Sequence, residues 1–170
     1  ADSGPVLGIA VTAADTANGS WYYSTDGGTN WNALGAVSDS SARLLRADTN
    51  CRLYFQPNAN YNGTLATAVT FRAWDQTSGA DGGTANTTTN GGTTAFSSAM
   101  ETASIVVTSA NDAPVITSDG GGASATVNAA ENGTAVTTVT ATDVDAATTF
   151  TYSISGGADA AKFAINSATG

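Results

Sequence analysis

The sequence predicts an all-β fold, and three observations carry this prediction. Apolar residues alternate with threonine and serine at the two-residue period of half-buried strands. Clusters of glycine, asparagine and aspartate interrupt these segments at roughly ten-residue spacing, which is typical of β-sandwiches. No window longer than about ten residues has the 3.6-residue apolar period of a helix. The 170 residues are enough for one sandwich domain and part of a second.

Residues 1–110 are expected to form a first sandwich domain with Greek-key topology. Its predicted strands cover residues 7–12, 19–24, 31–37, 42–45, 52–56, 68–74 and 102–108. A Thr-Asp-Gly-Gly sequence at 25–28 predicts the hairpin turn after the second of these strands. Residues 75–94 are rich in glycine, threonine and asparagine, so we expect a mobile polar loop outside the core.

Residues 111–114 read Asn-Asp-Ala-Pro and are interpreted as a hinge between two domains. Beyond the hinge, residues 115–170 are expected to form the N-terminal part of a second sandwich. Its predicted strands cover residues 115–116, 125–127, 136–141 and 150–154, and a fifth strand is expected to begin at Lys162.

The charge balance limits the partners of the chain. It has 14 acidic and 5 basic side chains and a formal net charge of -9. Nucleic acids and anionic membrane surfaces are therefore not expected partners, because both are bound through lysine and arginine. No apolar run is long enough for membrane insertion. The excess of carboxylates instead favours a hard cation with oxygen ligands, calcium above all.

The residue types that perform most catalysis are scarce. The chain has no histidine, and Cys51 is its one cysteine. Ser-His-Asp and Cys-His mechanisms are therefore excluded, as are most zinc and iron sites. The acids cluster at turns and hinges, so no enzymatic activity is expected, although paired-carboxylate chemistry stays open. Cys51 is expected to be a buried structural thiol, and without a disulfide an extracellular domain needs another staple, usually a metal.

The second half of the chain resembles a known family. The matching pieces are Asn-Asp-Ala-Pro at 111–114, Glu-Asn-Gly at 131–133, Val-Thr-Ala-Thr-Asp-Val-Asp at 139–145, Tyr-Ser-Ile at 152–154 and Phe-Ala-Ile at 163–165. Through these pieces, most of residues 113–170 is similar to bacterial cadherin-like repeats, which are related in architecture to immunoglobulin-like sandwiches.

The resemblance implies a calcium site at the entry to the second domain. Its implied ligands are Asn111, Asp112, Asp143 and Asp145. Glu131 would serve the next junction further along the chain. Calcium takes six to eight oxygen ligands, and an ion bound at the hinge would stiffen a junction that otherwise flexes. From the residues alone, an ordinary Asx turn before Pro114 is the alternative interpretation of this segment.

The first half resembles a repeat that is common in giant bacterial surface proteins. The motifs are Gly-Ile-Ala-Val-Thr at 8–12, Asn-Gly-Ser-Trp at 18–21, Tyr-Asn-Gly-Thr at 61–64 and Phe-Arg-Ala-Trp-Asp at 71–75. This resemblance implies that Asp2 is the remaining member of an Asp-x-Asp pair and that Asp75 is the late acid that closes the preceding junction. Both would serve calcium beside a neighbouring repeat.

Both resemblances also imply incomplete sandwiches, the first without its opening strands and the second without its closing strands. One hypothesis is that strands from a neighbouring copy complete each sandwich and build a head-to-tail fibre by strand addition. The alternative, which we favour, is that the chain is a piece of a longer protein or that its flanks are disordered.

Residues 24–31 read Ser-x-Asp-x-Gly-x-x-Trp, a pattern that resembles the Asp-box hairpin of sialidases and many unrelated β proteins. In this hairpin Asp26 is expected to accept hydrogen bonds from the turn backbone, and Trp31 is expected to pack against the turn. The pattern is structural in nearly all settings, so a glycosidase is not expected.

Aromatic side chains suggest the main alternative function, a carbohydrate-binding module. Trp21 and Tyr23 share one face of strand 19–24 while Tyr22 points the other way, so one set is expected in the core and the other on a ligand face. The aromatic residues in question are Trp21, Tyr22, Tyr23, Trp31, Tyr54, Tyr61 and Trp74.

The leading prediction is a non-enzymatic extracellular repeat on a bacterial cell surface, which extends and stiffens an adhesin or filament. Its expected partners are neighbouring repeats of the same protein, other copies of itself, and cell-surface glycans or proteins. Calcium is the expected cofactor.

Overall fold

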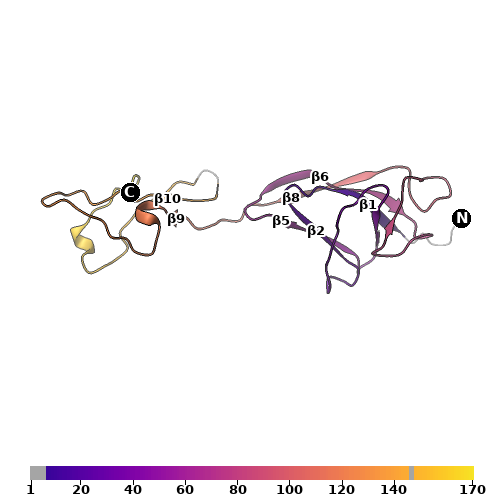
Figure 1. Ribbon diagram of the computed structural model, residues 1–170, viewed down its shortest axis with the longest axis horizontal. Coiled ribbons are helices and arrows are strands. Elements are labelled where there is room, and N and C mark those ends of the chain that lie inside the picture. Colours follow the sequence, from indigo (N-terminus) through magenta and orange to yellow (C-terminus); the bar gives the residue numbers. More distant parts are fainter. Residues whose placement is uncertain (1–6, 146–147) are drawn as a thin grey trace. The chain divides into compact units, whose positions relative to one another are not determined.

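The computed structural model describes residues 7–145 and 148–170, and the chain divides into two compact units (Figure 1). Unit 1 is Ala1–Ser109 and unit 2 is Ala110–Gly170. The predicted all-β class is confirmed, because the strands form antiparallel sheets. The described residues contain only two helical segments, the short 3-10 helices η1 (Ser118–Gly120) and η2 (Ala160–Lys162).

Unit 1 contains two antiparallel sheets, of five and three strands. The five-stranded sheet has the order β7-β4-β1-β6-β8, with β1 (Gly8–Ala14), β4 (Ala42–Arg46), β6 (Gly63–Trp74), β7 (Thr84–Ala85) and β8 (Glu101–Val107). The three-stranded sheet has the order β3-β2-β5, with β2 (Gly19–Ser24), β3 (Asn32–Ala33) and β5 (Arg52–Pro57). Five of these strands coincide closely with predicted ones. Strand β6 begins five residues before the predicted strand 68–74, β3 is shorter than predicted, and β7 has no predicted counterpart.

The main core of unit 1 lies between its two sheets. It contains Val11, Leu45, Leu65, Ala68 and Val69 from the five-stranded side and Trp21, Leu34 and Phe55 from the other. The Trp21 and Phe55 ring centroids are 4.9 Å apart. The Trp21 indole N–H donates to the Asp15 carbonyl at 2.7 Å, so its one polar atom is paired. Tyr23 packs against the same core, which makes the inward face of β2 the structural one.

A second apolar cluster lies on the other face of the five-stranded sheet. Its members are Ala10, Ala42, Leu44, Trp74, Ala95 and Phe96. Trp74 is 1% exposed, and its indole N–H donates to the Ser78 carbonyl at 2.7 Å. A side chain at Gly79 would collide with Leu44, so the chain approaches this face closely. Residues that follow β6 therefore cover this face of the sheet, and we name residues 75–100, which include the edge strand β7, the outer layer.

The prediction that residues 75–94 are a mobile polar loop outside the core is wrong. Within this tract β7 pairs with β4, and Thr87 is fully buried. The Thr87 hydroxyl donates to the Asp39 carbonyl at 3.0 Å, and its backbone N–H donates to the same oxygen at 2.6 Å. Hydrogen bonds, which a hydropathy pattern does not reveal, satisfy the polar groups that this tract buries.

Arg72 ties the outer layer to the sheet. It is 7% exposed, and its Nη1 donates to the carbonyls of Ser97 at 3.1 Å and Ser98 at 2.7 Å. Its Nε forms an ion pair with Asp39 Oδ1 at 3.3 Å. One buried guanidinium thus holds two backbone carbonyls and a carboxylate that also receives the Thr87 hydroxyl at 3.1 Å.

Unit 2 is sparsely paired. Its two-stranded sheet joins β9 (Val115–Ile116) to β10 (Ala141–Thr142). The predicted strands at 125–127 and 150–154 are not strands, and of the predicted strand 136–141 only Ala141 is in one. Lys162 belongs to η2 instead of opening a fifth strand. None of the described residues in unit 2 is buried. Its extended segments are held by single backbone hydrogen bonds, such as the one from Tyr152 N to the Ser167 carbonyl at 2.9 Å.

Candidate functional site

The acidic site predicted at the start of unit 2 is partly assembled. The Asp112 backbone N–H donates to Asp145 Oδ2 at 2.8 Å, although the two residues are 33 positions apart. The Asp145 N–H in turn donates to Asp143 Oδ1 at 2.8 Å. The Asn111 side-chain amide donates to the Asp112 carbonyl at 2.6 Å. The four residues are therefore linked in one hydrogen-bonded chain, which we name the acidic entry cluster.

The position of this cluster next to β10 explains how its residues come together. Asp143 directly follows that strand, and both Asp143 and Asp145 are half-buried, whereas Asn111 and Asp112 are exposed. The pairing of β9 with β10 brings the segment before β9 beside the loop after β10. The approach of Asp112 to Asp145 is thus a direct consequence of strand register.

The cluster has the donor chemistry of a calcium site but not a complete ligand shell. Its carboxylate and amide oxygens are the ligands that calcium prefers. Asp145 Oδ1, Asp143 Oδ2 and both Asp112 carboxylate oxygens have no hydrogen-bond partner among the residues that the structure describes. No three side chains of Asp, Glu, Cys or His in residues 7–145 and 148–170 are grouped closely enough to hold a metal by themselves. Backbone carbonyls and water would have to supply further ligands.

Electrostatics also favours a cation at the cluster. Unit 2 has a single basic residue, Lys162, and its ammonium pairs with Asp159 at 2.6 Å. No ion pair joins a basic group to Asp112, Asp143 or Asp145 within the described part of the chain. A divalent ion at the cluster would supply the positive charge that these described ion pairs do not provide.

Glu131 and Asp75, which are predicted to serve other junctions, make no hydrogen bond to this cluster within the described residues. Glu131 is exposed in a turn closed by the Gly133 N–H and the Ala130 carbonyl at 3.0 Å. Asp75 directly follows β6, and its carboxylate accepts the Thr77 hydroxyl at 2.6 Å and the Thr77 N–H at 2.9 Å. These two hydrogen bonds lower the pKa of Asp75. Asp2 lies outside the described residues.

The Asp-box hairpin at residues 24–31 forms as predicted. Asp26 Oδ1 accepts the Asn30 N–H at 2.9 Å and the Ser24 hydroxyl at 2.8 Å, while its Oδ2 accepts the Asn30 side-chain amide at 2.6 Å. Trp31 lies against Gly28, where an added Cβ would be 3.4 Å from the indole ring. The hydrogen bond from the Asn30 backbone, followed by those from the side chains of Asn30 and Ser24, lowers the pKa of Asp26 to about 2.

This pKa shift predicts acid sensitivity of unit 1. The folded pKa of Asp26 is about 2 and its ordinary value is 3.8, so the hairpin contributes stability that is present above pH 3.8 and is lost as the pH falls toward 2. Asp26→Asn should flatten the fall of the unit 1 melting temperature over that range, as followed by tryptophan fluorescence. Asp119→Asn, which removes the same charge from unit 2, is the control. If the melting temperature of Asp26→Asn fell with pH as steeply as that of the unaltered chain, this role of Asp26 would be contradicted.

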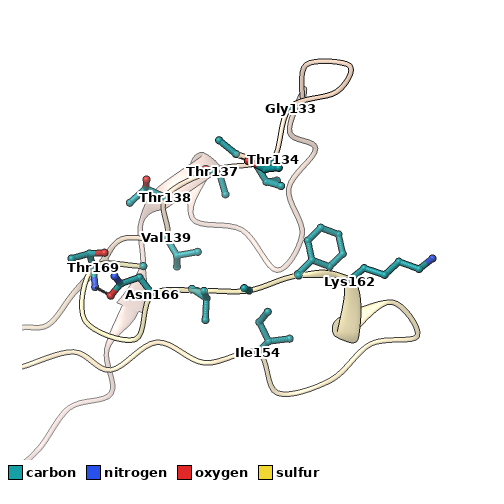
Figure 2. Close-up of a pocket in the computed structure, with 15 residues that line it drawn as sticks. Gly133, Thr134, Thr137, Thr138, Val139, Ile154, Lys162, Asn166 and Thr169 are labelled. Carbon is teal, nitrogen blue, oxygen red and sulfur yellow. Dashed lines mark hydrogen bonds between the residues drawn. The ribbon is translucent and has the colours of Figure 1, made fainter.

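Unit 2 also contains an open groove (Figure 2). It is lined by residues 133–139, 162–166, Ile154, Thr169 and Gly170 and has a volume of about 1030 Å³. Figure 2 shows Val139 and Ile154 directed from opposite sides toward the segment that runs from Lys162 to Asn166. The neighbouring Val136 and Phe163 are exposed. The groove thus leaves apolar side chains in contact with water.

The thiol of Cys51 is hydrogen-bonded to a carboxylate. Cys51 is half-buried just before β5, and its thiol donates to the Asp81 carboxylate at 3.1 Å. Burial, followed by the hydrogen bond to Asp81, raises the pKa of Cys51 to about 12. The thiol therefore stays protonated at neutral pH. The side chain is half-buried, not fully buried as predicted.

In the part of the chain that the structure describes, no helix is long and apolar enough to cross a bilayer. No protein-family model, no curated protein and no solved structure matches the chain.

Proposed function

We propose that the chain is a non-enzymatic structural and adhesive repeat, similar to cadherin-like and immunoglobulin-like Greek-key modules, that extends and stiffens a bacterial surface adhesin or filament. The observation that carries this proposal is the hydrogen bond from the Asp112 backbone to the Asp145 carboxylate. It fastens the segment through which the chain enters unit 2 onto the loop after β10.

Calcium is the proposed cofactor, and it would strengthen this contact between the entry segment and the loop after β10. Asn111, Asp112, Asp143 and Asp145 would hold the ion, and the ion would supply the positive charge that the cluster lacks. With the ion bound, residues 111–114 would lose freedom relative to the rest of unit 2, and the entry to the unit would become rigid. Glu131, Asp75 and Asp2 are proposed to serve the corresponding sites beside neighbouring repeats.

The proposed location is the outer surface of a bacterium, where calcium is available and a domain without disulfides benefits from a metal staple. The proposed partners are neighbouring repeats of the same protein and cell-surface glycans or proteins. A second copy of the chain is a further proposed partner, because the groove in unit 2 exposes apolar side chains beside extended backbone, the surface to which an added strand binds. A monodisperse monomer at high concentration would contradict this last proposal.

The calcium proposal is tested by titrating the full chain with calcium chloride in a calorimeter. The variant Asp143→Asn/Asp145→Asn keeps both hydrogen-bond acceptors but removes two charges, and we expect its calcium affinity to fall by more than about tenfold. Asp119→Asn is the matched control, because Asp119 adopts a positive φ that asparagine also tolerates and because it lies outside the cluster. Equal binding by the double variant and the control would contradict the assignment of these ligands.

A further inference from the structure

A group of aromatic side chains covers the outer face of the three-stranded sheet of unit 1. Tyr22 on β2 pairs in register with Tyr54 on β5, and their ring centroids are 6.3 Å apart. Trp31, just before β3, lies 5.5 Å from Tyr54 between centroids. Gln56 completes the lining of a concavity of about 210 Å³. We name Tyr22, Trp31, Tyr54 and Gln56 the aromatic platform.

The rings of the aromatic platform are not part of the core of unit 1. The inward residues of the same strands, Trp21 and Phe55, already fill the space between the sheets. Trp31 is 42% exposed and Tyr54 is 47% exposed. Large aromatic rings that stay together in water mark a binding surface more often than isolated exposed apolar residues do.

The platform is held in place before any ligand arrives. Tyr22 and Tyr54 project from paired strands, so the ladder of backbone hydrogen bonds between β2 and β5 fixes their spacing. Trp31 is the last residue of the Asp-box hairpin and lies against Gly28. The hydrogen bonds of Asp26 to Asn30 order the turn directly before it. A ligand would therefore lose less free energy to ordering these side chains on binding.

The chemistry of the platform selects the ligand. Aromatic faces pack against the apolar C–H faces of sugar rings, and the Gln56 amide offers both a donor and an acceptor for hydroxyl groups. None of the four lining residues is charged, so the concavity suits an uncharged ligand. We propose that the aromatic platform binds the pyranose rings of a neutral polysaccharide. This site lies wholly in unit 1 and does not depend on the calcium proposal.

The test measures binding of the full chain to cellohexaose, chitohexaose and laminarin, with alginate as an acidic comparison. Calorimetry gives the affinity, and the exposed Trp31 should report binding through a change in fluorescence. We expect at least one neutral saccharide to bind equally with calcium and with chelator. Trp31→Ala and Tyr54→Ala should each weaken that binding by about tenfold or more.

Phe163→Ala, which removes an exposed aromatic ring from unit 2, is the matched control and should bind as the unaltered chain does. Circular dichroism verifies that each variant is folded, and Tyr54→Phe, which keeps the stacking face, should retain most of the affinity. Three outcomes would overturn the proposal: no neutral saccharide binds, binding survives both alanine variants, or alginate alone binds. Self-association of the chain that Trp31→Ala abolishes would also overturn it, because the platform would then be a contact between copies.

Discussion

Replacing Trp74 by alanine should destabilise unit 1 by about 3–5 kcal/mol, the usual cost of emptying a large buried aromatic site. The indole is 1% exposed and packs with Leu44 and Phe96 under the outer layer. Its removal leaves a cavity and frees the Ser78 carbonyl. Urea unfolding followed by the fluorescence of Trp21 and Trp31 measures the loss, because all tryptophans of the chain lie in unit 1.

Trp31→Ala is the control for this measurement, since it removes the same side chain from a site that is 42% exposed. Its expected cost is less than about 1 kcal/mol. Limited proteolysis should also cut residues 75–100 faster in Trp74→Ala than in Trp31→Ala. Equal costs for the two variants would mean that the outer layer does not pack on the sheet.

Replacing Arg72 by methionine should cost about 3 kcal/mol, because the guanidinium is the donor for two backbone carbonyls as well as for a carboxylate. Arg72 itself is 7% exposed, but the Asp39 side chain is 41% exposed, so water can solvate the carboxylate after the change. Most of the expected loss therefore comes from the Ser97 and Ser98 carbonyls. The same urea unfolding experiment measures it.

Asp39→Asn is the informative comparison for Arg72→Met. Asparagine keeps an oxygen for Thr87 and Arg72 but loses the charge, and an ion pair with a partner this exposed contributes little. We expect a cost below about 1 kcal/mol. If Asp39→Asn were as damaging as Arg72→Met, the ion pair and not the carbonyl contacts would hold the outer layer.

The longer strands of unit 1 could be predicted from alternating apolar residues, whereas β3 and β7, with two residues each, are too short to carry such a pattern. Strand β2 is an example, since Trp21 and Tyr23 point inward and Tyr22 outward as the two-residue period requires. The outer layer could not be predicted in this way. Thr87 is buried through its hydrogen bonds to Asp39, and Gly79 allows close approach to Leu44, so neither contributes to an apolar pattern.

The two candidate sites could be predicted from the sequence to different degrees. The resemblance to cadherin-like repeats grouped Asp112 with Asp143 and Asp145, and the register of β9 and β10 brings those residues together. The aromatic platform needed the register of β2 and β5, which places Tyr54 beside Tyr22. Gln56 was missed as a site residue. The alternation within β5, which puts Tyr54 and Gln56 on one face, is the signal that would have found it.

The most direct test of the central claim is thermal unfolding of the unaltered full chain with calcium and with chelator, together with its sedimentation coefficient in both conditions. Calcium at a hundredfold above its dissociation constant should stabilise the unit that binds it by about 2.7 kcal/mol. We predict a higher melting temperature for unit 2 and a lower sedimentation coefficient in calcium, as a stiffened entry segment would give. Identical melting temperatures and sedimentation coefficients in the two conditions would contradict a calcium-stiffened repeat.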